Sequence, residues 1–419
     1  MKVLKQGVHL HVRPTSKFKT VSIQFKFRTP LQADQITKRT LLANMMDVNS
    51  KDYPTQIDFR KKLGELYGAS FYCDVSRYGN YHVLSVNMDC IDGKIVHEMG
   101  IFEDVIEFLH QVIFKPNVFD AKFHDATFNR EVEKLRDDYL SRYDDKSVYA
   151  DDKLNELYFD APEHRMLSYG QLSDLDDVTS AEVYETYLKM IKEDQLDIFI
   201  VGNVTEQRAA EAMGKFEFLP RNTLICDPFY KRSEDSKLRV GREDQNINQT
   251  ILTMGFQAPV YYHEPLYYAG LVFNGIFGGM AHSKLFQKIR EEENIAYAVS
   301  SDIDAYRGLL SVEAGIEYKD LERTKNIIIN QLVEIRKGNF TDHELFQTKE
   351  LLKSELLQIA DSPHSMIESD HSLGMIGMEA LSVDEWINRI DQVQGEEIAR
   401  LAGMIDLASI FELIGENCE

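Results

Sequence analysis

The sequence is poor in cysteine, and its cysteines are not arranged in pairs. Among 419 residues there are four, Cys73, Cys90, Cys226 and Cys418, and no two of them form a Cys-x-x-Cys motif. A disulfide framework and a cysteine-ligated zinc site are therefore not expected. Unpaired thiols are typical of the reducing cytoplasm.

Long apolar stretches are also missing. No uninterrupted apolar run approaches about 18 residues, the length that a membrane-spanning helix requires. The first residues, MKVLKQGVHLHV, alternate between charged and apolar side chains and contain no apolar core of a signal peptide. We therefore expect no signal peptide, no membrane partner and a cytoplasmic location.

Clusters of basic residues are absent. Lys and Arg number 47 against 69 Asp and Glu, which gives a net charge of −22. Nucleic-acid surfaces are basic, so a nucleic-acid partner is not expected. An acidic surface suits basic peptides, although many acidic proteins are acidic only to remain soluble.

The sequence does contain a long internal repeat. FRKKLGELYGASFYCDVSRYGNYHVLSV begins at Phe59, and FQKIREEENIAYAVSSDIDAYRGLLSV begins at Phe286; each predicts a helix followed by two strands. A second match, IVG at 200–202 and LIG at 413–415, ends a strand after a helix in both halves. The offset of about half the chain indicates a tandem duplication of whole domains, because solenoid repeats are only about 20–50 residues long.

The region 220–236 separates the two halves. It has two prolines, mixed charge and weak periodicity, so we interpret it as a linker between domains 1–219 and 237–419. Each half mixes strands with long helices without strict βαβ alternation. The expected fold class is α+β, with two homologous tandem domains in which helices pack on mixed or antiparallel sheets.

The stretch from Phe277 to Asp302 concentrates the candidate functional residues. The pair Gly278-Gly279 interrupts an apolar segment, and the periodicity then predicts a helix and a strand. Arg290 falls near the end of that helix, and Tyr297, seven residues later, near the start of the strand, so both side chains can reach one point. The residues alone leave open a simpler interpretation, in which Arg290 pairs with neighbouring glutamates and Tyr297 is packed.

The same stretch resembles a known family signature. GGMAHSKLFQKIREEENIAYAVSS is similar to the second-domain signature of pitrilysin-type (insulinase-type) peptidases, which include insulin-degrading enzyme and the subunits of the mitochondrial processing peptidase. The order of elements agrees over nearly the whole chain. The resemblance implies two tandem α+β domains that open like a clam and form half of a peptidase chamber.

The zinc motif of that family is missing here. Its members bind zinc through His-x-x-Glu-His on a first-domain helix, with the Glu as general base. Aligned on Asp52-Tyr53-Pro54, this chain has Thr40, Ala43 and Asn44 at those three positions, and these side chains cannot replace the ligands and the base. Asp138 is the nearest match to the further glutamate ligand. We therefore expect no metal and no other cofactor.

The second half of the family's active site is retained. The resemblance implies that Arg290 and Tyr297 contact the substrate and the oxyanion formed during attack, and that Gly278 and Gly279 lie near the substrate. An arginine and a phenol suit developing negative charge. The first copy of the repeat has Leu63 and Ser70 at the matching positions, so the pair is not a property of the repeat itself.

These observations predict a protein without peptidase activity of its own. We expect the non-catalytic subunit of a heterodimeric zinc peptidase, whose Arg290 and Tyr297 complete the site of a zinc-bearing pitrilysin-type partner and whose domains shape the peptide chamber. One alternative is a peptide-binding or scaffold protein without a peptidase partner.

Another alternative is a metalloenzyme with an unrecognised site. His364, Glu368 and His371 are spaced i, i+4 and i+7 and share one face of a predicted helix, where histidine and glutamate are legitimate zinc ligands. The competing interpretation is an exposed polar helix face.

Overall fold

The protein divides into two compact units that exchange segments. The computed structural model describes residues 1–233 and 237–415, so Cys418 lies outside the described residues. Unit 1 comprises Met1–Leu140, Leu167–Pro228 and Asp361–Ala380. Unit 2 comprises Ser141–Met166, Phe229–Ala360 and the described residues from Leu381 onward.

Unit 1 is built on a six-stranded mixed sheet with the strand order β1-β2-β8-β3-β5-β4. Within this sheet the β2–β8 pair is parallel, and the other neighbours are antiparallel. The strands are β1 (Lys2–Lys5), β2 (Val8–Pro14), β3 (Thr20–Pro30), β4 (Ser70–Tyr78), β5 (Tyr81–Ile91) and β8 (Gln195–Gly202).

One face of this sheet carries the apolar core of unit 1. Residues of β3 alternate, and Val21, Ile23, Phe25 and Phe27 point into a large cluster of buried side chains. Amphipathic helices close the cluster; α3 alone buries eight residues. Besides the short β6 (Val118–Phe119) and β7 (Lys122–Phe123), the elements here are α1 (Ala33–Val48), α2 (Gln56–Glu65), α3 (Ile101–Phe114), α4 (Asp125–Asp144), η1 (Leu172–Asp176), α7 (Ser180–Glu193) and α8 (Glu206–Met213).

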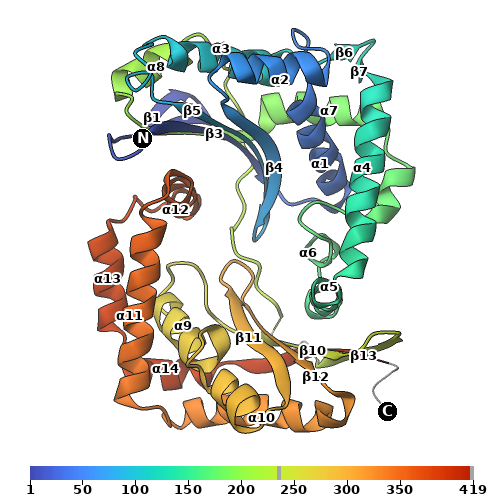
Figure 1. The fold of residues 1–419 in the computed structure, drawn as a ribbon, viewed down its shortest axis with the longest axis vertical. Coiled ribbons are helices and arrows are strands. Elements are labelled where there is room, and N and C mark those ends of the chain that lie inside the picture. Colours follow the sequence, from blue (N-terminus) through green and yellow to red (C-terminus); the bar gives the residue numbers. More distant parts are fainter. Residues whose placement is uncertain (234–236, 416–419) are drawn as a thin grey trace. The chain divides into compact units, whose positions relative to one another are not determined.

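The opposite face of the sheet carries both polar and apolar residues and is covered by α12 (Pro363–Met375), a helix from the C-terminal half of the chain (Figure 1). The alternate residues of β3 that face it are polar: Gln24 bonds to His364 and Lys26 to Glu368. A buried polar residue requires such partners. Unit 1 therefore depends on a segment that lies more than 130 residues after Pro228 in the sequence.

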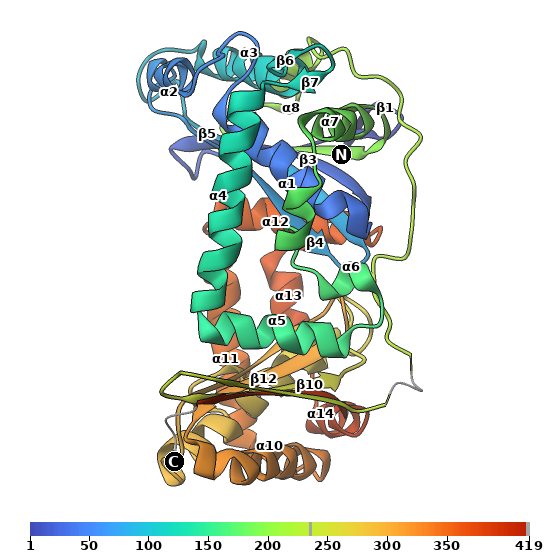
Figure 2. The same ribbon diagram turned by 90° about the vertical axis from the view of Figure 1, so that its right-hand side faces the viewer.

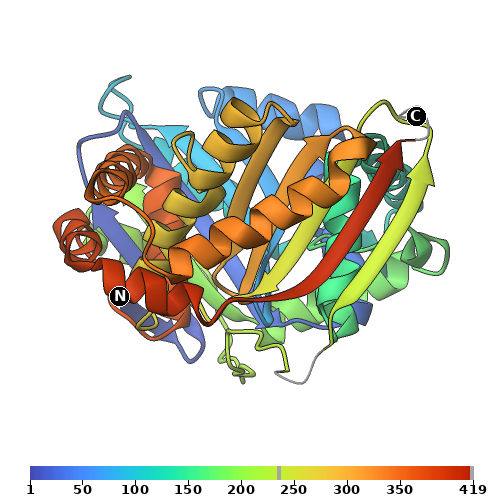
Figure 3. The same cartoon turned by 90° about the horizontal axis from the view of Figure 1, so that it is seen from below.

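Unit 2 repeats the sheet of unit 1. Its strand order is β11-β12-β10-β13-β9, again with one parallel pair, β13–β9, and antiparallel neighbours (Figure 3). The strands are β9 (Arg239–Gln245), β10 (Thr250–Gln257), β11 (Ala296–Asp304), β12 (Leu309–Ile316) and β13 (Asp406–Gly415). This order and these directions match β4-β5-β3-β8-β2, so the predicted duplication and the α+β fold class are confirmed.

Helices also cover both faces of the second sheet. One face packs on an apolar cluster that includes side chains of α9, α10 and α14. The other face packs on α5, which lies against β10 and β13 (Figure 2). The elements are α5 (Lys146–Tyr158), α6 (Pro162–Arg165), α9 (Tyr267–Asn274), η2 (Gly275–Gly279), η3 (Phe286–Glu292), η4 (Tyr318–Asp320), α10 (Leu321–Arg336), α11 (Asp342–Ile359), α13 (Val383–Gln392) and α14 (Gly395–Ala402).

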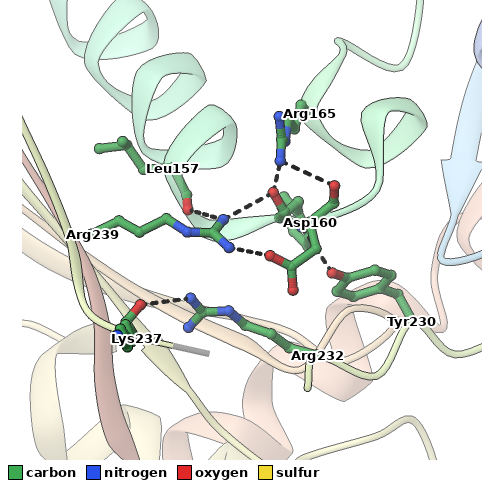
Figure 4. A network of polar contacts seen from close by, with 8 residues as sticks. Leu157, Asp160, Arg165, Tyr230, Arg232, Lys237 and Arg239 are labelled. Atoms are coloured by element: carbon green, nitrogen blue, oxygen red, sulfur yellow. Dashed lines mark hydrogen bonds and ion pairs between the residues drawn. The ribbon is translucent and has the colours of Figure 1, made fainter. Parts of the chain in front are cut away.

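A polar network fastens the end of α5 within unit 2 (Figure 4). Arg239 on β9 donates to the carbonyl oxygen of Leu157 at 2.8 Å and forms an ion pair with Asp160. Arg165 donates to the carbonyl of Asp160 at 3.0 Å. Arg232, in the second half of the predicted linker, has its guanidinium 4.8 Å from the centre of the Tyr158 ring.

The exchange of segments was not predicted from the sequence. We expected two contiguous domains joined by the linker 220–236, whereas the compact units trade the segments 141–166 and 361–380. The predicted linker is also anchored. Arg221 is 2% exposed and donates to the carbonyl oxygens of Met190 and Asp194, and the backbone N–H of Cys226 donates to the Tyr81 hydroxyl.

Candidate functional site

Arg290 and Tyr297 are placed by two irregularities of the backbone. Arg290 lies in η3, a π-helical segment, and Tyr297 is the extra residue of a β-bulge between Ala296 and Ala298 on the edge strand β11. Between them, Asn294 adopts a left-handed conformation with φ of 52°. Bulges and π-helical turns re-aim side chains and are frequent at functional sites.

The two side chains line the same pocket. It has a volume of about 310 Å³, and Arg290, Asn294, Ile295, Ala296, Tyr297 and Glu317 line it. Tyr297 is 73% exposed, so its ring is not packed in the core. The structure thus brings the two predicted residues together.

Two of the three acids that follow Arg290 bind other partners. Glu293 pairs with Lys288 and Arg323, and Glu292 pairs with Lys288. In the part of the chain that the structure describes, Arg290 forms no ion pair; its guanidinium lies over the Phe286 ring at 4.9 Å. The simpler interpretation, in which neighbouring glutamates neutralise Arg290, does not describe this arrangement.

Gly278 and Gly279 lie at the end of η2, where space is limited. A Cβ atom on Gly278 would approach Ser301 Oγ to 2.6 Å and Leu285 Cδ1 to 2.9 Å. On Gly279 it would approach the Asn274 side chain to 2.5 Å. Close packing accounts for both glycines, and their contact with substrate stays a prediction.

The degenerate zinc positions lie on α1 in unit 1. Thr40 is buried and its hydroxyl donates to the carbonyl of Ile36 at 3.1 Å, Ala43 is 1% exposed, and Asn44 is half-buried. None offers a metal-binding nitrogen or carboxylate. Among the described residues, no three His, Cys, Asp or Glu side chains come together in a way that could hold a metal ion.

Two acids near these positions were missed by the sequence interpretation. Glu131 on α4 is 2% exposed, whereas Asp138, the expected remnant of the glutamate ligand, is exposed. Burial raises the pKa of Asp47, at the end of α1, to about 6, and the charge of Glu131 adds to this rise. Arg60, whose Nη2 lies 3.6 Å from Asp47 Oδ2, opposes it. The sequence did contain a signal for the burial of Glu131. It is spaced i+3 from Phe128 and i−4 from Leu135, so it shares the apolar face of that helix.

The interpretation of the α12 residues as an exposed polar face was wrong. His364 accepts or donates hydrogen bonds with Gln24 and Asp89, and Glu368 binds Lys26 and the Tyr78 hydroxyl. His371 is 2% exposed. All three side chains pack against the sheet of unit 1, because that face of β3 is itself polar. Among the described residues, His364, Glu368 and His371 do not come together as a group that could hold a metal ion.

Comparisons with known proteins identify the family of this chain. Residues 177–352 match the family described as "Peptidase M16 inactive domain". The chain is 30% identical over 410 residues to "Probable inactive metalloprotease YmfF" of Bacillus subtilis, covering 98% of this chain and 96% of that protein. It is 26% identical over 214 residues to "Uncharacterized zinc protease YmxG" of the same organism, about half of each chain.

Solved structures show the same fold. A conserved protein from Enterococcus faecalis has a TM-score of 0.93 at 36% identity and covers 99% of this chain and 98% of its own. An M16 inactive domain from Pseudomonas fluorescens has a TM-score of 0.80 at 15% identity and covers 98% and 96%.

No helix among the described residues is long and apolar enough to span a membrane. The repeated sheet accompanies near full-length similarity to an inactive metalloprotease and a match to the M16 family. The chain therefore belongs to the M16 (pitrilysin-type) peptidase family.

Proposed function

We propose that this protein is the non-catalytic subunit of a heterodimeric zinc peptidase. In this proposal a pitrilysin-type partner supplies the zinc ion and the general base, while this chain supplies Arg290 and Tyr297 and shapes part of the peptide chamber. The observation that carries the proposal is the pocket shared by Arg290 and Tyr297 in a chain whose α1 has no His-x-x-Glu-His motif.

The chemistry of the pair supports this role. When peptide hydrolysis begins, negative charge develops on the carbonyl oxygen of the scissile bond, and preorganised donors stabilise it. Arg290 carries a permanent positive charge that no described carboxylate neutralises, and Tyr297 presents an exposed hydroxyl. Such donors do not activate water, so the chain needs a zinc-bearing partner for turnover.

The names of relatives support the division of labour. YmfF is described as an inactive metalloprotease, whereas YmxG of the same organism is described as a zinc protease. AlbE of Bacillus subtilis is 26% identical over 180 residues and is described as a biosynthesis protein of the bacteriocin subtilosin. Peptides are therefore the proposed substrate class.

Affinity purification from the source cells tests the proposal. Mass spectrometry of the purified complex should identify a second chain with an intact His-x-x-Glu-His motif. The isolated protein should hydrolyse no peptide, and the pair should do so in a zinc-dependent way. Recovery of this chain alone, or peptide turnover by the isolated chain, would overturn the proposal and favour a binding or scaffold protein.

A further inference from the structure

A second pocket in unit 2 lies away from Arg290 and Tyr297 and has a volume of about 440 Å³. It lies between the loop before α9 and the segment that joins α13 to α14. The lining residues are His263, Glu264, Pro265, Tyr268, Ala269, Arg389, Gln392, Val393 and Glu397. Its volume falls within the range of small-molecule sites.

An aromatic cluster holds one wall of this pocket. His263 contacts the rings of Tyr262, Tyr267, Tyr268 and Trp386, with centroid distances between 4.5 and 5.5 Å. It is kept in a left-handed conformation, with φ of 57°, which costs free energy for a non-glycine residue. The wall is therefore made of aromatic rings packed around His263.

Hydrogen bonds join three residues of this wall. Arg389 Nη1, which can only donate, lies 3.5 Å from the Tyr268 hydroxyl. The same hydroxyl lies 2.8 Å from His263 Nδ1, and the direction of that hydrogen bond depends on the histidine tautomer. His263 Nε2 is a buried atom without a hydrogen-bond partner among the described residues.

Arg389 forms no ion pair within 4.0 Å among the described residues, although the charge of Glu385, one turn earlier on α13, acts on it at longer range. Glu385 also accepts from Ser382 in a capping box. Glu397 accepts from the backbone N–H of Gln394 at 2.9 Å, and Glu264 lies 4.0 Å from Lys231. Arg389 directs one donor at the Tyr268 hydroxyl, 3.5 Å away, and its remaining donors can bind a carboxylate through two parallel bonds.

We propose that this pocket binds a small monocarboxylate with an apolar body, either a free amino acid or the C-terminal residue of a peptide. Arg389 binds the carboxylate, and Tyr268, Ala269 and Val393 contact the body. The carboxylates of Glu264 and Glu397 oppose a doubly charged phosphate at the same position, so a carboxylate is preferred.

The chain's single tryptophan, Trp386, reports on this site directly. Its ring lies 4.7 Å from His263 and 5.7 Å from Tyr268. Titration with N-acetyl-L-phenylalanine should change its fluorescence in a saturable way, whereas N-acetyl-L-phenylalanine amide, which lacks the carboxylate, should not. Free L-phenylalanine is then compared with a tripeptide that ends in phenylalanine. Tighter binding of the amino acid indicates a site for free amino acids, and tighter binding of the tripeptide indicates a site for peptide C-termini.

Arg389→Gln should raise the dissociation constant of the ligand about tenfold or more. Arg389→Lys should raise it by less, because lysine keeps the positive charge but lacks the planar pair of donors. Arg400→Gln, an exposed arginine on α14 outside the pocket, is the matched control and should bind as the wild type. Circular dichroism and calorimetric titration of each variant confirm folding and binding without relying on fluorescence. No saturable change, an equal response to the amide, or unchanged binding by Arg389→Gln would each refute the proposal.

Discussion

At the residue scale, local backbone irregularity accounts for the position of the candidate site. The spacing of seven between Arg290 and Tyr297 was readable from the sequence, and so was its match to a family signature. The π-helical turn and the β-bulge were not, because a one-residue insertion in a helix or strand leaves the hydrophobic pattern almost unchanged. These irregularities bring both side chains to one pocket.

The close packing around Gly278 predicts that a larger residue at this position destabilises the protein. Gly278→Ala should destabilise the protein by about 1–3 kcal/mol, because the new methyl group meets Ser301 and Leu285 in a well-packed region. Gly64→Ala is the matched control. It lies in α2 with no atom within 4 Å of its Cβ position and should stabilise by up to about 1 kcal/mol. Urea unfolding measures both; equal effects would contradict the packing account.

The pair of His364 and Asp89 makes stability depend on pH. The hydrogen bond to Asp89 raises the pKa of His364, while the bonds from His364 and Ser22 lower the pKa of Asp89 against its burial. The raised histidine pKa contributes stability that is complete below about pH 6.5 and is lost as pH rises through the folded value. The lowered aspartate pKa contributes stability that is present above about pH 4 and is lost as pH falls further.

His364→Gln should therefore lower Tm most between about pH 5 and 6. Because the pair is partly exposed, we expect a decrease of about 2 °C there and less than half of that at pH 8. Gln24, Glu368 and Lys26 also face this histidine and remain unchanged in the variant. Asp89→Asn, and the double variant, complete a cycle measured by calorimetry across pH. A pH-independent difference would show that the pair contributes packing only.

At the scale of elements, many helices and strands could be predicted from the sequence, but the unit to which each belongs could not. Alternation on β3 and the repeat around Phe59 and Phe286 placed the paired strands of both sheets. The exchange of α5 and α12 could not be read in the same way, since amphipathicity shows that a helix has a buried face but not which sheet it covers. Polar residues on β3 were the missed signal: Gln24 and Lys26 are each 2% exposed.

The ion pair between Lys26 and Glu368 provides a test of how α12 is held on unit 1. Lys26 Nζ lies 2.6 Å from Glu368 Oε1, and Lys26 is buried whereas Glu368 is partly exposed. Glu368→Gln leaves a buried charge without its counter-ion and should cost about 2–4 kcal/mol. Hydrogen exchange should rise in residues 363–375 more than elsewhere.

Lys26→Met combined with Glu368→Gln should recover part of that loss, because the double variant removes the buried charge itself. Glu350→Gln, which removes a partly exposed pair with Lys353 on α11, is the control and should change stability by less than about 0.5 kcal/mol, because Lys353 keeps its pair with Asp391. Equal costs for the two glutamate substitutions would show that α12 is held by its apolar contacts around Ile367 instead.

At the scale of the whole molecule, the duplication places the two sets of candidate residues in different halves of the chain. The two sheets share strand order and direction, yet unit 1 carries the altered motif positions on α1 and unit 2 carries the Arg290 and Tyr297 pocket. The fold, the family and the loss of the motif were predictable from the sequence. The proposed partner can be named only as a class, because this chain would carry no trace of the other half of a split site.

The most direct test of the proposed split site is the peptidase rate of the reconstituted pair. Arg290→Gln and Tyr297→Phe should each lower kcat/KM by about 10²-fold, since each removes a donor to the developing oxyanion. Assembly with the zinc-bearing partner should be unchanged, and the exposed-residue controls Arg323→Gln and Tyr67→Phe should leave the rate within about twofold of the wild type. A rate unchanged by Arg290→Gln and Tyr297→Phe in an assembled complex would contradict the account.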